Sequence, residues 1–397
     1  MAAAATLCCY CMSHGYMRGY KKLNQHLLNT QYINRRYQVL SLPGAVWMPL
    51  DKTNIKQLHS IRVHQISSES RADQYTDTTP IEEEDNISKA TLIWRAIKLP
   101  IYTVALIPIT VGSAAAYLHT GQYFAKRYFT LLASSILIIA WLNLSNDVYD
   151  FDTGADINKK ESVVNLIGSR TGTHIVAWIL LIIGFVGLTW VSFEAGSLRS
   201  VFLLSYAIIC GYIYQCPPFR LSYIGLGEPL CFAAFGPFAT TAFYLLQSGT
   251  RELSISKIVV ASSILVGFTT SLILFCSHFH QIEDDKAVGK CSPLVRLGTE
   301  AGAKVVKVAV VTLYSLLFLL GLGQALPFSS VVLCALTLPI GKLIVNFVEE
   351  NHKDKTKIFM AKYYCVRLHT LFGAAFAAGL VAARMFAGKQ LPHAIIL

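Results

Sequence analysis

Long apolar segments separated by short polar loops make up most of the chain after residue 98. A window of about 19 residues finds roughly nine segments long enough to span a bilayer. Backbone groups in hydrocarbon must pair within their own segment or in a closed barrel, and barrel strands would alternate apolar and polar residues. The pattern therefore predicts an all-α, polytopic membrane protein with about nine transmembrane helices. The predicted spans cover residues 99–118, 129–146, 173–193, 199–214, 227–246, 258–278, 302–322, 328–348 and 366–386.

Composition agrees with this interpretation and excludes other classes. Hydrophobic residues make up 54% of the 397 residues and charged residues 14%, which argues against two or three soluble domains. The ten cysteines include one CxxC spacing, Cys8 to Cys11, with no second pair to complete a zinc site. The net charge of +11 lies mainly in short loops beside apolar spans, and no basic helix is present. Nucleic-acid binding is therefore not expected.

The first part of the chain has a different composition from the rest. Residues 1–50 contain no Asp or Glu but several Lys and Arg, a pattern typical of organelle transit peptides, although a basic tail without a fold would also fit. The stretch 67–85, SSESRADQYTDTTPIEEED, is polar and acidic and lacks periodicity. We expect a transit peptide over residues 1–60, a polar linker over 61–90 and the membrane domain over 91–390.

The number of spans predicts which loops share a side of the membrane. The segment before the first span and the loops after the second, fourth, sixth and eighth spans must lie on one face. That face carries most of the loop lysines and arginines, so the positive-inside bias places it on the cytosol-like side, the stroma or the matrix. The basic residues there are Lys159, Lys160, Arg170, Arg220, Lys286, Lys290, Arg296, Lys353, Lys355 and Lys357.

An acidic run, NDVYDFDTGAD at 146–156, directly follows the second apolar span. An Asp near the bilayer core costs about 2.5 to 3.5 kcal/mol on insertion scales, so carboxylates there need partners. Hard oxygen ligands followed by lysines suit a magnesium-bridged diphosphate, and Thr153 and Gly154 are expected to end the helix. A continuous helix places one polar stripe at i, i+3, i+4 and i+7, namely Asn143, Asn146, Asp147 and Asp150. Asp152, Asp156, Lys159, Lys160 and Arg170 follow the stripe.

A second acidic run, HFHQIEDDKAVGK at 278–290, ends the sixth span on the same predicted face. If the helix continues, His278, Gln281, Asp284 and Asp285 share one side while Glu283 turns away. Each acidic run alone would suit a solvated helix end. Two such runs on one face, with Arg220 in a loop between them in sequence, favour a diphosphate site with apolar walls.

Histidines and tyrosines near these runs are candidates for a pocket. His278 and His280 could begin a zinc or iron site, but no further ligands follow at the usual spacing, which favours a structural or supporting role. Tyrosine faces could screen a carbocation, whereas singly each is more often core packing or part of an interface belt. The candidates are Tyr149, Tyr212, Tyr214, Phe219 and Tyr223.

Four stretches of this sequence resemble the UbiA superfamily of membrane prenyltransferases, and within it the branch that prenylates 1,4-dihydroxy-2-naphthoate. They are NxxND at 143–147 with the run NDVYDFDTGAD, the second acidic run, WRAIKLPIYTVALIPITVGSA at 94–114, and GKCSPLVRLG at 289–298. The resemblance covers about residues 95–385 and implies a UbiA-like helical bundle. It also implies Mg²⁺ as cofactor. One departure is Gln281, where the family usually has Asp, so Glu283, Asp284 or Gln281 itself could complete the second ion site.

The resemblance implies a role for each candidate residue. We expect Asp147, Asp150 and Asp285 to be catalytic. The expected metal ligands are Asn146, Asp147, Asp150, Asp156, Gln281, Glu283, Asp284 and Asp285. The expected diphosphate-binding residues are Lys98, Lys159, Lys160, Arg170, Arg220 and Lys290. The expected aromatic and prenyl pocket comprises Asn143, Tyr149, Tyr214, Tyr223 and His280.

The implied activity is transfer of a prenyl group, phytyl for a chloroplast protein, from its diphosphate to 1,4-dihydroxy-2-naphthoate with loss of carboxylate, as in phylloquinone synthesis. The implied partners are phytyl diphosphate, the naphthoate and the lipid bilayer. The implied location is a thylakoid or inner-envelope membrane with the site facing the stroma. Alternatives are a homogentisate or 4-hydroxybenzoate acceptor, and an ion transporter. A transporter would place its acids near the midplane in broken helices, whereas these acids lie at span ends.

Overall fold

The structure is a computed structural model that describes residues 96, 98–155, 162–248 and 254–389. The chain divides into two units, 1–81 and 82–397, and all described residues belong to the second. The predictions for residues 1–60 and 61–90, and for Asp156, Lys159 and Lys160, lie outside the described residues. Within the described ranges the secondary structure is entirely helical, which confirms the predicted fold class.

Eight helices in the described part of the chain are long and apolar enough to cross a membrane. A ninth span is possible if α15 and α16, which meet at 41°, form one bent span. The order therefore matches the nine predicted spans. The helices are α4 (Thr103–Thr120, preceded by η1, Leu99–Tyr102), α5 (Ala125–Thr153), α7 (Arg170–Glu194), α8 (Leu198–Gln215), α9 (Gly227–Ala233) with η3 (Ala234–Thr240) and α10 (Thr241–Gln247), α11 (Lys257–Ser277), α14 (Thr299–Leu322), α15 (Phe328–Ala335) with α16 (Leu338–Asn351), and α18 (Ala361–Lys389).

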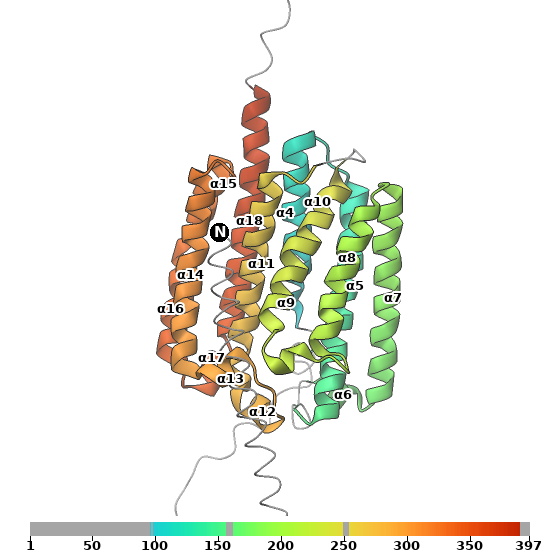
Figure 1. Cartoon of the computed structure of the whole chain (residues 1–397), viewed down its shortest axis with the longest axis vertical. Coiled ribbons are helices and arrows are strands. Elements are labelled where there is room, and N and C mark those ends of the chain that lie inside the picture. Colours follow the sequence, from blue (N-terminus) through green and yellow to red (C-terminus); the bar gives the residue numbers. More distant parts are fainter. Residues whose placement is uncertain (1–95, 97, 156–161, 249–253, 390–397) are drawn as a thin grey trace, which may run out of the picture. The chain divides into compact units, whose positions relative to one another are not determined.

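Short helices in the connections gather at one end of the bundle. Figure 1 shows α6, α12, α13 and α17 together there, although they come from three different loops. These are the loops after the second, sixth and eighth predicted spans, so the expectation that they share one face is confirmed. The elements are α6 (Val163–Ile167), η2 (Leu221–Ile224), η4 (Phe279–Gln281), α12 (Ile282–Ala287), α13 (Pro293–Leu297) and α17 (Lys355–Ile358).

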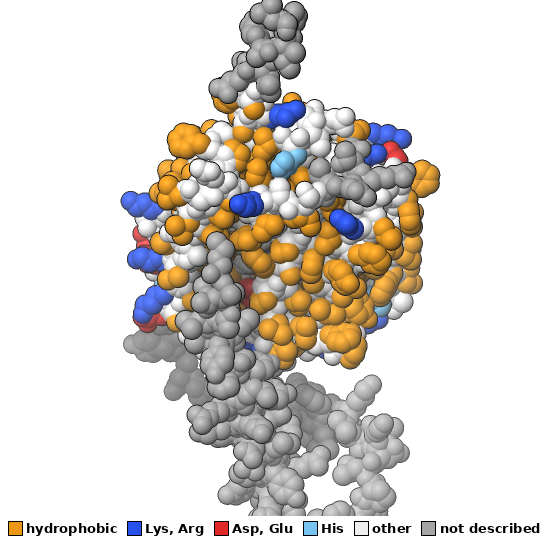
Figure 2. All heavy atoms as spheres, turned by 45° about the horizontal axis from the view of Figure 1, so that its top comes forward, with side chains coloured by type: hydrophobic (Ala, Val, Ile, Leu, Met, Phe, Trp, Pro, Cys, Tyr) orange, Lys and Arg blue, Asp and Glu red, His pale blue; other side chains and the backbone are white. Residues whose placement is uncertain are grey.

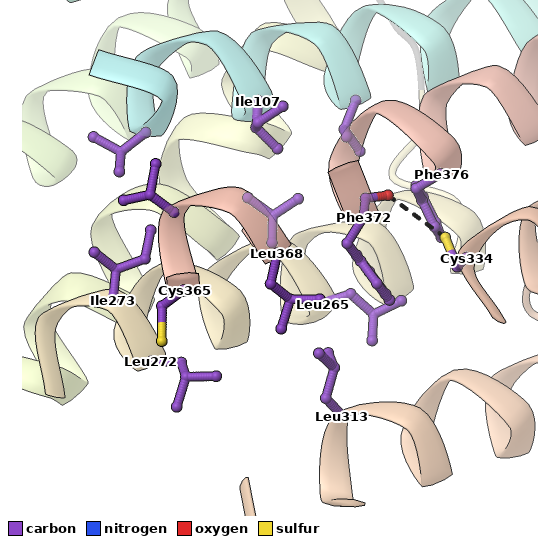
Figure 3. Close-up of a cluster of buried hydrophobic side chains, with 14 of the residues drawn as sticks. Ile107, Leu265, Leu272, Ile273, Leu313, Cys334, Cys365, Leu368, Phe372 and Phe376 are labelled. Atoms are coloured by element: carbon purple, nitrogen blue, oxygen red, sulfur yellow. Dashed lines mark hydrogen bonds between the residues drawn. The ribbon is translucent and has the colours of Figure 1, made fainter. Parts of the chain in front are cut away.

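Two clusters of buried apolar side chains hold the bundle together. One joins α4, α11, α14, α15, α16 and α18, and Figure 3 shows Leu265, Leu313 and Phe372 from three of these helices meeting in it. The other joins α5, α7, α8 and α10 around Trp141, which is almost fully buried. Both clusters include side chains of α4 and of α10. These two helices therefore connect the two clusters.

Many large apolar side chains lie on the outer surface. On α7, side chains such as Ile182, Val186 and Trp190 are more than half exposed. Figure 2 shows a broad hydrophobic surface that few charged side chains interrupt. An exposed apolar surface of this extent marks contact with lipid, so the chain is a multi-pass membrane protein.

The fifth span is interrupted by η3, a seven-residue π-helix that contains Pro237. This span packs closely on α11, because a Cβ added at Gly267 would lie 3.2 Å from Cα of Gly236 in η3 and 2.7 Å from the carbonyl oxygen of Phe232 at the end of α9. On α4, a Cβ at Gly112 would lie 2.8 Å from the carbonyl oxygen of Thr240. Glycine at both positions lets three backbones approach one another, and π-helical turns are frequent at functional sites.

We expect Gly267→Ala to lower the melting temperature of the detergent-solubilised protein by a few degrees. The added methyl group must push the end of α9 and the start of η3 away from α11, and such overpacking typically costs about 1 to 3 kcal/mol. Gly323→Ala is the matched control, since its Cβ would meet nothing closer than 3.3 Å. Equal melting temperatures for the two variants would contradict this account of the helix contact.

Candidate active site

A cavity of ≈ 320 Å³ opens among α4, α5, α8, the η3 span and α11, near the end of the bundle that carries the short helices. Its deep part is lined by aliphatic and aromatic side chains. Its mouth is lined by polar and charged ones. The apolar lining includes Val104, Ile138, Leu142, Leu188, Leu204, Ile208, Ala234, Phe235, Ala239, Phe243 and Ile273. The polar lining includes Lys98, Asn143, Asn146, Asp150, Tyr214, Gln215, His278, His280, Gln281, Lys290, Lys362 and Tyr363.

One wall of the mouth is the end of α5. The helix continues through the acidic run, as predicted, and ends at Thr153 with Gly154 at φ 89°. Asn146 Nδ2 donates to Asp150 Oδ2 at 2.7 Å, and both residues line the cavity together with Asn143. The amide of Asn143 has a buried Nδ2 without a hydrogen-bond partner. Three residues of the predicted stripe therefore face the cavity.

Asp147, the fourth member of the stripe, is engaged in a different way. Its side chain is 1% exposed, and Oδ1 accepts a hydrogen bond from Lys98 Nζ at 2.9 Å. Oδ2 accepts one from the backbone N–H of Val163 at 3.1 Å. Asp147 thus ties the start of α4 and the start of α6 to α5. Lys98 lines the cavity and has a left-handed backbone, φ 53°, which is uncommon for residues other than glycine.

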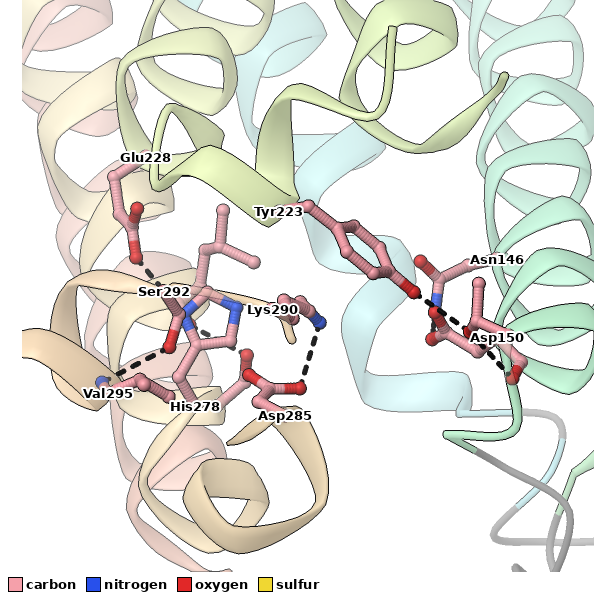
Figure 4. A network of polar contacts seen from close by, with 12 residues as sticks. Asn146, Asp150, Tyr223, Glu228, His278, Asp285, Lys290, Ser292 and Val295 are labelled. Carbon is pink, nitrogen blue, oxygen red and sulfur yellow. Dashed lines mark hydrogen bonds and ion pairs between the residues drawn. The ribbon is translucent and has the colours of Figure 1, made fainter. Parts of the chain in front are cut away.

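The opposite wall is the segment after α11. The condition of a continuous helix is not met here, because α11 ends at Ser277 and a 3₁₀ turn, η4, precedes α12. The break turns α12 so that Asp285 is buried and pairs with Lys290, Nζ to Oδ1 at 3.1 Å. The other oxygen, Oδ2, is buried without a hydrogen-bond partner. In Figure 4, Asp285 and Lys290 lie across an open space from Asn146 and Asp150.

Within α12, Asp285 points away from its acidic neighbours, because successive residues of a helix are rotated by about 100°. Asp284 is 54% exposed and pairs with Lys355 of α17 at 3.2 Å. Glu283 is 74% exposed and pairs with Lys286. Gln281 stays at the cavity wall. The structure thus places Gln281 and Asp285 near the cavity, and Asp284 and Glu283 on the surface, so the expected shared face of Asp284 and Asp285 does not form.

The loop between α8 and α9 covers the space between the two walls. Tyr223 donates its hydroxyl to Thr153 Oγ1 at 2.9 Å, and its carbonyl accepts from the N–H of Cys291 at 2.8 Å. Its ring lies 5.8 Å from Arg220 Cζ and 5.9 Å from Lys290 Nζ, so two cations gather around it. Arg220 has a left-handed backbone, φ 43°, and a buried Nε without a hydrogen-bond partner.

Burial alone would lower the pKa of Lys290. The Tyr214 hydroxyl and the carboxylates of Asp150 and Asp285 outweigh this effect, so the pKa lies above its ordinary value. The ammonium therefore stays charged throughout the physiological pH range. A permanent cation between two carboxylate-bearing walls is suited to hold a multiply charged anion.

Arg170 and Tyr149 are among the predicted site residues that do not line the cavity. Arg170 makes a two-pronged hydrogen bond to Asp152, Nε to Oδ1 at 3.0 Å and a terminal nitrogen to Oδ2 at 2.6 Å. The Tyr149 hydroxyl lies 3.4 Å from His174 Nε2 on α7. Tyr214 and His280 line the cavity as expected.

Several cavity residues were not predicted as site residues. Glu228 of α9 was not predicted, and its Oε1 lies 3.1 Å from Nδ1 of His278, for which the sequence favoured a structural or supporting role. Gln215 donates to the carbonyl of Leu142 at 3.0 Å and also lines the cavity. Lys362 and Tyr363 reach the cavity from the start of α18. In the sequence, Lys362 directly precedes an apolar span, a position where lysine is common in membrane proteins, so nothing marked it as a site residue.

The described residues contain no cluster of three or more His, Cys, Asp or Glu side chains around one point. Magnesium does not require one, because it keeps several waters and binds through one or two carboxylates plus substrate phosphate oxygens. Asp285 Oδ2, buried and without a hydrogen bond, is an acceptor that a cation would satisfy. The oxygen-bearing residues of the two walls therefore fit a magnesium–diphosphate group.

The model of the UbiA prenyltransferase family matches residues 105–366, which include both walls of the cavity. The chain belongs to the UbiA prenyltransferase family. The chain is 62% identical, over 84% of its length and 87% of the relative, to 2-carboxy-1,4-naphthoquinone phytyltransferase, chloroplastic, of Arabidopsis thaliana. It is 43% identical, over 77% of its length and 97% of the relative, to 2-carboxy-1,4-naphthoquinone phytyltransferase of Synechocystis sp..

A solved structure has the same fold. The UbiA homolog from Archaeoglobus fulgidus bound to DMAPP and Mg²⁺ matches with a TM-score of 0.54 and 17% identity, over 75% of this chain and 99% of the homolog. The predicted resemblance and the UbiA-like bundle are both confirmed.

We expect Asp147→Asn to lower the melting temperature by several degrees. An asparagine can keep one of the two hydrogen bonds, but its Nδ2 then faces Lys98 Nζ or the Val163 N–H, and breaking a buried ion pair costs about 3 to 5 kcal/mol. Asp284→Asn is the matched control, because its ion pair with Lys355 is exposed and contributes little. If both variants have the melting temperature of the unmodified protein, the contacts of Asp147 with Lys98 and Val163 do not stabilise the fold as described.

Proposed function

We propose that the protein transfers a phytyl group from phytyl diphosphate to 1,4-dihydroxy-2-naphthoate, with loss of the carboxylate as carbon dioxide, in phylloquinone biosynthesis. The observation that carries this proposal is the cavity itself, with two acid-bearing walls and lysines at its mouth and an aliphatic lining in its depth. The high identity to two phytyltransferases supports the choice of donor and acceptor.

Asn146 and Asp150 on one wall, and Asp285 with Gln281 on the other, are the residues that would hold Mg²⁺. The ion would neutralise charge on the diphosphate as it leaves. Asp156 stays a predicted ligand outside the described residues. Asp147, with both oxygens engaged, acts in this proposal by holding Lys98 at the cavity rather than by touching the ion.

The basic residues bind the diphosphate and stabilise it as a leaving group. Lys98 and Lys290 line the mouth from opposite walls, and Arg220 approaches from the covering loop. Each is fixed by its own carboxylate or ring, so little reorganisation is needed as negative charge develops on the bridging oxygen. Tyr214 and Tyr223 place aromatic faces near the same end of the cavity, where they can screen a cationic prenyl carbon and exclude water.

Electron counting allows either oxidation state of the acceptor, and the reactivity of the ring decides between them. In either the quinone or the dihydroxy form, the carbon–carboxylate bond breaks, carbon dioxide leaves, and its bonding pair stays on the ring carbon that bonds to C1 of the prenyl group. Both forms therefore balance without an oxidant or reductant. Only the dihydroxy ring is electron-rich enough to attack a cationic carbon readily, and we propose it as the attacking species.

We further propose that the protein works in a chloroplast membrane, either thylakoid or inner envelope, with the cavity mouth facing the stroma. The chloroplastic name of the Arabidopsis relative supports the organelle. The lysines and arginines of the loops at the mouth support the orientation under the positive-inside bias.

A product assay tests the proposed function. We expect purified protein with Mg²⁺, phytyl diphosphate and dihydroxynaphthoate to form a product whose mass equals demethylphylloquinol or its quinone. Geranylgeranyl diphosphate, homogentisate and 4-hydroxybenzoate serve as competing substrates in parallel reactions. Preferential prenylation of homogentisate or hydroxybenzoate would overturn the acceptor, and a product that retains the carboxylate would overturn the reaction.

Substitutions at the two walls test the ion site. We expect Asp150→Ala and Asp285→Ala to abolish turnover, because each removes a carboxylate beside the diphosphate. Magnesium affinity, read from the ion dependence of the rate, should be highest in Gln281→Asp and fall through the unmodified protein to Gln281→Ala, since an added carboxylate attracts the ion.

Glu283→Ala is the matched control on the same short helix. Its side chain is exposed and directed away from Asp285, so the ion dependence should not change. If Glu283→Ala loses magnesium as strongly as Asp285→Ala, the assignment of the second wall is wrong. If Gln281→Ala is as inactive as Asp285→Ala, then Gln281 is a metal ligand or a substrate contact that activity requires as strictly as it requires Asp285.

A further inference from the structure

The corner between α17 and α18 adds a third wall to the cavity mouth, made of aromatic rings and one lysine. Phe359, Lys362 and Tyr363 all line the cavity. Lys362 Nζ lies 3.8 Å from the ring centroid of Phe359 and 5.3 Å from that of Tyr363. The edge of this group meets His280, whose ring centroid is 4.9 Å from that of Phe359 at an interplanar angle of 80°.

The lysines at the mouth divide into two kinds. Lys98 and Lys290 are each in an ion pair with a buried carboxylate of the first two walls, Asp147 and Asp285. They belong to the end that binds the diphosphate and its ion. Lys362 comes from a different element, the start of α18, and its ammonium lies at the cavity beside the rings of Phe359 and Tyr363.

The two substrates present different chemistry to these walls. The donor has a diphosphate and a long aliphatic chain, which suit the first two walls and the aliphatic depth of the cavity. The acceptor is a flat aromatic ring with a carboxylate beside the reacting carbon. A flat ring with an anionic edge is recognised by aromatic side chains next to a fixed cation.

We propose that Lys362, with Phe359 and Tyr363, forms the acceptor subsite, in which the ammonium binds the ring carboxylate and the aromatic side chains pack on the bicyclic ring. This inference rests on the proposed function. It assigns the third wall to an aromatic carboxylate and leaves the diphosphate to Lys98, Lys290 and Arg220.

The fate of the carboxylate determines which kinetic constant this contact affects. The group leaves as neutral carbon dioxide, so the ion pair with Lys362 exists before the reaction and is lost in the product. While the ring carbon bonds to C1 the carboxylate is still attached, so the contact is equally strong in the bound acceptor and in that transition state, and it contributes to acceptor binding and not to the chemical step. It also gives the decarboxylated product a lower affinity than the acceptor, which favours its release.

Lys362→Met keeps the length of the side chain and removes the charge. We expect the KM for dihydroxynaphthoate to rise roughly ten- to hundredfold, while kcat and the KM for phytyl diphosphate change by less than about twofold. Lys362→Arg should recover most of the affinity. Lys355→Met is the matched control, because this lysine of α17 is exposed, pairs with Asp284 and does not line the cavity.

Unreactive ligands separate this inference from the proposed function. 1-Hydroxy-2-naphthoate and 1-naphthol differ only by the carboxylate, and their affinities can be measured by calorimetry without turnover. We expect the unmodified protein to prefer the naphthoate and Lys362→Met to lose that preference. An unchanged preference in Lys362→Met, or a rise in the KM for phytyl diphosphate instead, would overturn the subsite. Failure of the product assay with the preference intact would overturn only the proposed function.

Discussion

Carboxylates at the ends of apolar helices must be paired, and the structure is arranged around the two pairs that result. Asp147 with Lys98 and Asp285 with Lys290 are both nearly buried, where an unpaired charge would be costly. The first pair joins two segments that are 49 residues apart in sequence. The second pair joins α12 to the loop that follows it. The same pairs place two ammonium groups at the mouth. One constraint thus fixes both the loops of this end and the charge that a diphosphate requires.

The cavity separates two tasks along its length. Its depth is formed by aliphatic side chains of α4, α5, α8 and the η3 span, and its mouth by three polar walls. An isoprenoid chain in the depth places its reactive carbon at the mouth, where ions, cations and aromatic rings are concentrated. Strained backbone occurs at the same place, since Lys98 and Arg220 are two of the three described non-glycine residues with positive φ.

The sequence predicted what depends on short-range patterns. Nine apolar segments identified the spans, and the spacing of Asn143, Asn146 and Asp150 predicted a polar stripe that the structure directs into the cavity. The break after Ser277 could not be predicted in this way. It is a 3₁₀ turn, and His278 directly before it contacts Glu228 of α9, a partner 50 residues away in sequence. The role of Lys362 was also hidden, because only the fold brings the start of α18 to the mouth.

The π-helix η3 has a consequence for how the width of the cavity can change. A π-turn is an α-helix with one residue inserted, and α9 and α10 continue regularly on either side of it. Deleting one residue between Ala234 and Thr240 would close the bulge and leave the flanking turns in register. In the other spans a one-residue deletion rotates everything beyond it by about 100°. The fifth span is therefore the place where length variation can reshape the prenyl end without disturbing the carboxylate walls.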